Sequence, residues 1–232
     1  MIERDRFTVV TPSPTELCWD FSKSTQPYYL TRQSTEWSYR RRLEVDPFPG
    51  YSHDEIEAAS AAHLVTEIFP IPFHTTFYLL PHEASERMNG WTDRQHNYAE
   101  KDRHEWVPQV VLSGKRVPLH PAMTRYLVGH EYGHVVQFWL AAKLFEEHDR
   151  TDKLMNAYRE LRGGSAEWDR HEYVGGRWHE SILEIMACDF RILVTKLESG
   201  YWPHPGIQRP EQIPALVDWW NQRRFEALAG AS

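Results

Sequence analysis

Hydrophobic and polar residues follow a helical rhythm over much of this chain. After Ser52, which is a favourable N-cap residue, apolar positions return at helical spacing from Ile56 to Leu64, and Pro70 ends the pattern. A long helix is predicted from Pro121, a residue that favours the first turn of a helix, to about Glu147. Further helices are expected after Thr151, at about 178–197, and across 216–225.

Short β-branched and aromatic runs predict the strands. The clearest is Thr75–Leu80, which Pro81 ends, and others are expected at 7–10, 28–31, 106–112 and 117–119. The polar stretch from Glu83 to His104 is interpreted as a long loop, or a loop with a short helix. The pattern predicts an α+β fold, with a small, mostly antiparallel sheet packed on the long helix and a helical C-terminal half.

A break at Asp46-Pro47-Phe48-Pro49-Gly50 suggests how the chain is divided. We expect residues 1–50 to form an N-terminal segment that packs on a main domain of residues 51–232, which forms one unit. The chain has 232 residues, of which 41% are hydrophobic and 13% aromatic, and this composition is typical of a folded protein with a sizeable core.

The net charge and the lengths of the apolar segments argue against nucleic-acid and membrane partners. A net charge of -7 argues against a general nucleic-acid binder, which needs excess Lys and Arg to contact phosphates. The N-terminus shows no signal-peptide pattern, and no run of about 18 uncharged apolar residues is present, so we expect a cytoplasmic protein without membrane contact. The two cysteines, Cys18 and Cys188, are expected to be free buried thiols.

The long helix after Pro121 contains the sequence His130-Glu131-Tyr132-Gly133-His134. Residues four apart lie above one another on a helix, so the imidazoles of His130 and His134 can bind one metal ion. Glu131 lies about 100° further round, where its carboxylate can reach a metal-bound water and act as a general base. The motif therefore predicts a zinc-dependent hydrolase.

An ordinary helix whose histidines form routine hydrogen bonds is the alternative interpretation. The flanks of the motif are apolar, which indicates that this helix is buried, and buried imidazoles and carboxylates need partners. Gly129 and Gly133 each cost about 1 kcal/mol of helix stability relative to Ala. We therefore expect another part of the chain to approach the helix closely on that side.

A catalytic zinc site normally has three protein ligands, so a third must come from elsewhere. Leu140 occupies the position where a metzincin has its third His, and the surroundings of Cys18 do not match those of the peptide deformylase cysteine. The segment Glu184–Phe190 resembles the glutamate helix of the gluzincins, since Glu184, Ala187 and Phe190 match its spacing. Asp189 stands one place later than the Asp that supports a zinc-bound His in thermolysin-like members.

The resemblance implies a zincin-like fold and a metallopeptidase that holds one zinc ion with His130, His134 and Glu184. Glu131 would be the general base and a peptide or protein the substrate. By the same resemblance, the strand Trp106–Leu112 would form the rim of the cleft, and Tyr173, His171 or His179 would stabilise the oxyanion.

Several alternatives stay open at this point. Glu180 lies one turn before Glu184 on the same expected helix, so it competes for the role of third ligand. Glu184 would then stand four residues after the ligand, in the place of the carboxylate that supports a zinc-bound His. The protein could also be a non-catalytic binding module that keeps a structural zinc, or a zinc hydrolase of a non-peptide amide. The sequence indicates neither the substrate nor the oligomeric state.

Overall fold

The structure is a computed structural model, which describes residues 1–11, 53–80, 89–97, 105–112, 119–147, 151–164 and 178–230. The chain divides into two units, one made of Met1–His63 and Phe73–Glu131, the other of Leu64–Pro72 and Tyr132–Ser232. The division falls within two helices, α3 (Glu55–Ile68) and α4 (Pro121–Phe145). The break predicted at residues 46–50 lies outside the described residues, so that domain boundary stays a prediction.

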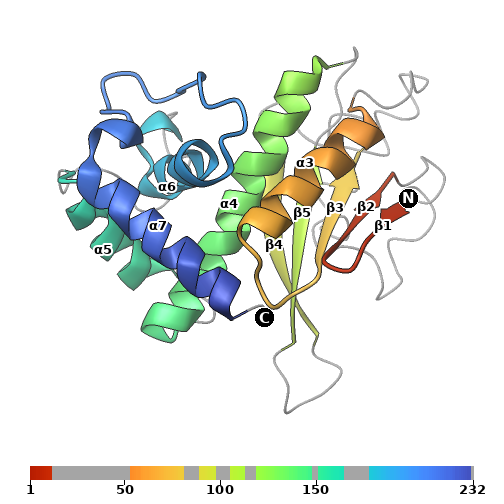
Figure 1. Cartoon of the computed structure of the whole chain (residues 1–232), viewed down its shortest axis with the longest axis horizontal. Helices are drawn as coiled ribbons and strands as arrows, with labels where there is room; N and C mark the ends of the chain where they lie inside the picture. Colours follow the sequence, from red (N-terminus) through yellow and green to blue (C-terminus); the bar gives the residue numbers. More distant parts are fainter. Residues whose placement is uncertain are drawn as a thin grey trace. The chain divides into compact units, whose positions relative to one another are not determined.

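The first unit contains a sheet whose described strands have the order β1-β2-β3-β5-β4 (Figure 1). These strands are β1 (Ile2–Glu3), β2 (Phe7–Val10), β3 (Thr75–Leu79), β4 (Gly90–Asn97) and β5 (Glu105–Leu112). The pairs β2-β3 and β3-β5 are parallel, and β1-β2 and β4-β5 are antiparallel. The sheet is therefore mixed, and the prediction of a mostly antiparallel sheet was wrong.

The parallel pairs follow from the connections between strands. Parallel neighbours need a crossover connection between them. Helix α3 lies in the connection from β2 to β3, and strand β4 lies in the connection from β3 to β5. The predicted strands at 7–10, 75–80 and 106–112 correspond to β2, β3 and β5. Those predicted at 28–31 and 117–118 lie outside the described residues, and Leu119 belongs to no strand.

The segment interpreted as a loop contains the strand β4. Its sequence, Gly-Trp-Thr-Asp-Arg-Gln-His-Asn, shows no apolar alternation. Strand β4 pairs with β5 along its whole length, from Gly90 opposite Leu112 to Asn97 opposite Glu105. Backbone pairing with a neighbouring strand therefore forms an element that its own side-chain pattern did not predict.

Helix α3 begins three residues after the predicted N-cap Ser52. The Asp54 carboxylate accepts hydrogen bonds from the backbone N–H groups of Ile56 and Glu57, at 2.8 and 3.0 Å. Asp54 thus satisfies two of the amides that a helix leaves unpaired at its start. The predicted cap was Ser52, whereas Asp54 acts as the cap.

The second unit is helical. Besides the second part of α4 it contains α5 (Asp152–Leu161), α6 (Ile182–Phe190) and α7 (Pro214–Ala229), with the short helices η2 (Trp178–Glu180), η3 (Arg191–Thr195) and η4 (Pro210–Gln212) (Figure 1). The single helix predicted at 178–197 is a 3-10 turn, an α-helix and a π-helical turn, because Ser181 is extended between η2 and α6.

Aromatic side chains form the centre of this unit. Phe69, Phe190 and Trp220 pack edge to face, with ring centroids 5.4 to 6.3 Å apart. Next to them, the Trp220 indole N–H donates to the hydroxyl of Tyr158 at 2.9 Å. Burial and the neighbouring Asp189 raise the pKa of Tyr158 well above its ordinary value, so its neutral hydroxyl donates to the Asp189 carboxylate at 2.6 Å.

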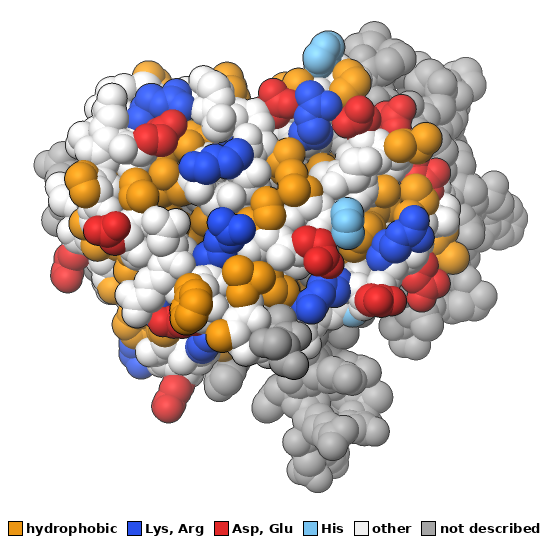
Figure 2. Space-filling model, viewed as in Figure 1, with side chains coloured by type: hydrophobic (Ala, Val, Ile, Leu, Met, Phe, Trp, Pro, Cys, Tyr) orange, Lys and Arg blue, Asp and Glu red, His pale blue; other side chains and the backbone are white. Residues whose placement is uncertain are grey.

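Other sequence expectations concern the thiols, the membrane and the surface charge. Cys188 is free and buried, as expected, whereas Cys18 lies outside the described residues. Within the described part of the chain, every helix is too short or too polar to cross a bilayer. On the face drawn in Figure 2, the described basic and acidic side chains are interspersed, without a broad patch of one sign.

Candidate metal centre

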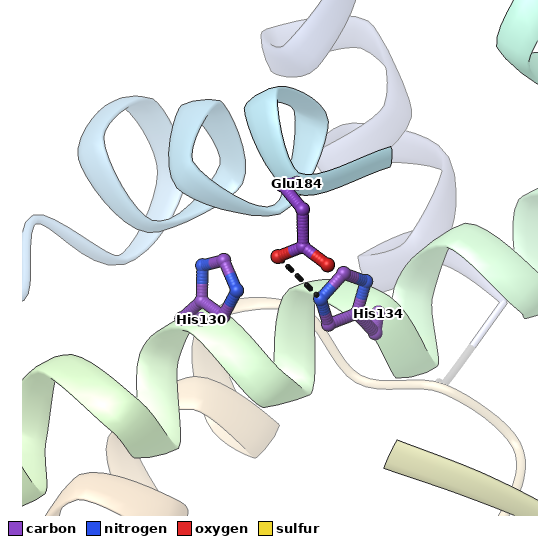
Figure 3. A group of neighbouring side chains, drawn as sticks. All are labelled: His130, His134 and Glu184. Carbon is purple, nitrogen blue, oxygen red and sulfur yellow. Dashed lines mark ion pairs between the residues drawn. The ribbon is translucent and has the colours of Figure 1, made fainter. Parts of the chain in front are cut away.

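Three side chains that can bind a metal come together on helices α4 and α6. His130, His134 and Glu184 each offer a ligand atom, and these atoms lie within 4.8 Å of one another (Figure 3). All three residues are buried, with exposed fractions of 3% to 6%. Within the described ranges this is the one group of at least three His, Cys, Asp or Glu residues with such geometry.

The register of α4 orients the two imidazoles. His130 and His134 are one helical turn apart, and Figure 3 shows both rings on the side of the helix that faces the Glu184 carboxylate. The ring of Tyr126, one turn earlier, stacks on that of His130 with centroids 5.8 Å apart and planes 15° apart. This stacking restricts the orientation of the first ligand.

A close helix contact brings Glu184 to the imidazoles. A Cβ atom at Gly133 would lie 3.0 Å from both the Cα and the carbonyl oxygen of Ala187, which is closer than real Cβ atoms ordinarily approach. Gly133 therefore lets the backbone of α6 approach α4 at Ala187. Glu184 lies one turn before Ala187, and the contact confirms the expectation that another segment approaches at Gly133.

The separation of the donor atoms of His134 and Glu184 suits a shared metal ion. His134 Nε2 lies 3.4 Å from Glu184 Oε2. Two atoms that each bind a tetrahedral zinc ion at about 2.1 Å are about 3.4 Å apart. Two imidazole nitrogens and one carboxylate oxygen form a donor set that zinc and similar divalent ions bind. The residues present therefore fit a metal ion, and burial of the carboxylate increases the need for a positive partner.

Glu180, the alternative third ligand, is not part of the cluster. It lies in η2, its side chain is 40% exposed, and its carboxylate is 3.6 Å from His179 Nε2. The extended backbone at Ser181 separates η2 from α6, so Glu180 and Glu184 do not share one continuous helix face. The premise that made Glu180 a competitor was wrong.

Strand β4 holds the carboxylate of Glu131. The Thr92 hydroxyl lies 3.0 Å from Glu131 Oε2 and 2.8 Å from the Glu131 backbone oxygen, with geometry for donating to either. A Cβ atom at Gly90 would lie 2.9 Å from Glu131 Oε1 and 3.0 Å from the Val111 carbonyl oxygen. Glu131 is only 5% exposed, so β4 leaves its carboxylate little freedom.

Sequence reasoning missed Gly90 and Thr92 because they lie in the segment interpreted as a loop. The absence of a side chain at Gly90 makes room for the Glu131 carboxylate. The strand predicted to form the rim, Trp106–Leu112, lies between β3 and β4 in the sheet. The described sheet ends at β1 on one side and at β4 on the other. Strand β5 is paired on both sides, so it offers no edge for pairing with a peptide, and its place at the rim of a cleft stays a prediction.

Asp189 belongs to a network away from the imidazoles. Its carboxylate accepts from Arg162 Nε and Nη2 at 2.7 and 2.8 Å and from the Tyr158 hydroxyl. All of these groups are buried. Asp189 thus anchors α6 to α5 through Arg162 and Tyr158.

The predicted oxyanion residues do not join the cluster. Tyr173 and His171 lie outside the described residues. His179 is in η2 with a 39% exposed side chain. The assignment of Tyr173 therefore stays a prediction.

Comparison with known proteins does not add a family. The sequence matches no family model and none of the curated proteins searched. A function must therefore be inferred from the metal centre itself.

Proposed function

We propose that this protein is a zinc-dependent metallopeptidase with a gluzincin-like site on a zincin-like fold. The observation that carries this proposal is the buried group of His130, His134 and Glu184, with the acid Glu131 directly after the first ligand. Such a set, with three protein ligands and one acid beside them, leaves a coordination position for water.

Each residue then has a defined chemical role. A bound zinc ion would lower the pKa of its water to about 7, so that hydroxide is available at neutral pH. Glu131 accepts the water proton at a carboxylate oxygen while the water oxygen attacks the peptide carbonyl, and then delivers that proton to the leaving amine. Thr92 and Gly90 keep the Glu131 carboxylate in a restricted position for both transfers.

An edge strand next to the general base supports a peptide as the substrate. Strand β4 is at one edge of the described sheet, and Thr92 on it contacts Glu131. An extended peptide can bind such an edge through backbone hydrogen bonds, with its carbonyls at defined positions along the strand. This arrangement favours a peptide over a small non-peptide amide.

The test combines metal analysis with one substitution. The purified protein should bind one zinc ion per chain and cleave a library of quenched fluorescent peptides. Glu131→Gln should lower the turnover by about 100-fold or more and leave the bound zinc unchanged, because it removes the proton acceptor and no ligand. His130→Ala should lose both the metal and the activity.

Two results would contradict the proposal. A protein that binds no stoichiometric zinc, even after zinc is added back, has no such centre. A protein that binds zinc, cleaves no peptide in the library and performs its function equally well as Glu131→Gln is a binding module.

A further inference from the structure

We propose that Gln137 is a positioning residue that sets the tautomer and orientation of the metal ligand His134. This inference rests on the proposed metal centre. Gln137 is fully buried on α4, three residues after His134. Its Oε1 lies 3.0 Å from His134 Nδ1, and its Nε2 donates to the backbone oxygen of Leu183 at 2.7 Å.

The Leu183 carbonyl decides which way the Gln137 amide points. A carbonyl oxygen can only accept a hydrogen bond, so the NH₂ group of Gln137 must face Leu183. The reverse orientation would place two oxygens 2.7 Å apart in a buried site, with neither able to donate. The Gln137 Oε1 therefore faces the His134 ring.

The amide orientation in turn fixes the proton on the imidazole. Oε1 can only accept, so His134 Nδ1 must carry a hydrogen. In a neutral imidazole the other nitrogen, Nε2, then has the free lone pair. Nε2 is the atom that lies 3.4 Å from Glu184 Oε2, on the side where the metal ligands meet. The proton is thus held away from the metal before any ion binds.

The same amide also joins the two elements that carry the ligands. Leu183 directly precedes Glu184 at the start of α6, so Gln137 ties the ring on α4 to the backbone beside the third ligand. Close to it, Gly133 and Ala187 set the distance between these helices. Gln137 therefore prepares the relative position of His134 and Glu184 in the metal-free protein.

Two substitutions separate the bonds of Gln137. Gln137→Met keeps the length of the side chain and removes both hydrogen bonds. Gln137→Glu keeps an accepting oxygen for the ring, while its second oxygen keeps the bond to the Leu183 carbonyl only when the carboxyl is protonated. Gln222→Met makes the same change at an exposed position of α7, where the amide donates to Glu226, and is the matched control.

The first measurement is ¹⁵N imidazole NMR of the metal-free protein at pH about 8, where an ordinary imidazole is neutral. We expect His134 to be the Nδ1-H tautomer in the wild type, in Gln137→Glu and in Gln222→Met. Gln137→Met should give a mixture of tautomers at His134. His130, which serves as the reference in each spectrum, should not change.

The second measurement is zinc affinity by competition with a chelator. Gln137→Met should bind zinc about 10–100-fold more weakly, as is typical when the partner of a ligating histidine is removed. Gln222→Met should match the wild type within twofold.

Three results would overturn the inference: the Nε2-H tautomer in the wild type, an unchanged tautomer with unchanged affinity in Gln137→Met, or loss of the Nδ1-H tautomer in Gln137→Glu. The last applies even if the Met variant does not fold. A wild type that binds no zinc would instead contradict the proposed function, while the spectra of the metal-free protein would still decide the tautomer.

Discussion

Glu184 is the residue on which the metal centre depends most, because it alone comes from outside α4. Glu184→Gln replaces a charged ligand by a weak neutral one. We expect zinc affinity to fall by more than the roughly 10–100-fold typical for loss of a ligand's supporting partner. Chelator competition measures this, and Glu180→Gln is the matched control, with an expected change below twofold. The opposite pattern would make Glu180 the ligand.

Thr92 allows the proposed role of Glu131 as general base to be tested without changing a residue of the metal cluster. Thr92→Val removes the hydroxyl that contacts the Glu131 carboxylate and preserves the shape of the side chain. A hydrogen bond to a charged group contributes about 1.5–3 kcal/mol, so kcat/KM should fall about 10–100-fold. Zinc affinity should stay the same. Thr92→Ser, which restores a hydroxyl, should recover most of the activity. A Val variant with wild-type kinetics would show that Glu131 does not need Thr92.

Some residues of the site could be predicted from the sequence, and others could not. Spacing alone predicted the two histidines of the cluster, His130 and His134, since one helix turn separates them, and the role of Glu131 as general base stays a prediction. Family resemblance, rather than pattern, identified Glu184. Gln137 and Thr92 escaped notice because their roles depend on contacts with Leu183 and Glu131 that only the folded chain creates.

At the scale of elements, the contact between α4 and α6 controls the centre. Gly133→Ala would ordinarily stabilise a helix by about 1 kcal/mol. Here the new methyl group meets the backbone of Ala187, so we expect a loss of about 1–3 kcal/mol in the free energy of unfolding, together with weaker zinc binding. Urea denaturation measures the first quantity.

Gly230→Ala is the control for this change. Gly230 follows α7 with φ of -82°, and a Cβ atom there would be 3.5 Å from its nearest neighbour, an ordinary contact. It should leave stability almost unchanged. A Gly133→Ala variant that is more stable than the wild type would show that α6 can move away at no cost.

Elements with complete side-chain patterns were predictable, and those formed by their neighbours were not. Strand β3 was predicted from its run of β-branched and aromatic residues, and it buries Thr75, Phe77 and Leu79 in alternation. Strand β4 is polar and exists because β5 pairs with it. The helix expected at 178–197 is broken at Ser181, where the backbone is extended. Helix propensity did not predict this break.

At the scale of the whole molecule, metal binding should increase the stability of the folded protein. An ion that binds only the folded protein stabilises it by about 4 kcal/mol when its concentration is 1,000 times the Kd. For a chain of this size, that corresponds to an increase in Tm of about 8–16 °C. Chelation should therefore lower Tm by this amount, as differential scanning calorimetry would show. His130→Ala should have a low Tm that the chelator does not change, and an equal chelator effect in both proteins would contradict the metal centre.

The contact at Gly133 constrains how this sequence can diverge through packing, whereas Glu131 would constrain it through chemistry. The atoms that exclude a side chain there include the backbone of Ala187, so no smaller residue at position 187 can make full room for one. If the proposed catalysis were lost in a descendant, Glu131 would be free to change, whereas a side chain at position 133 would still cost stability at the contact with Ala187. Retention of Gly133 would therefore indicate a common architecture, and retention of Glu131 would indicate the proposed chemistry.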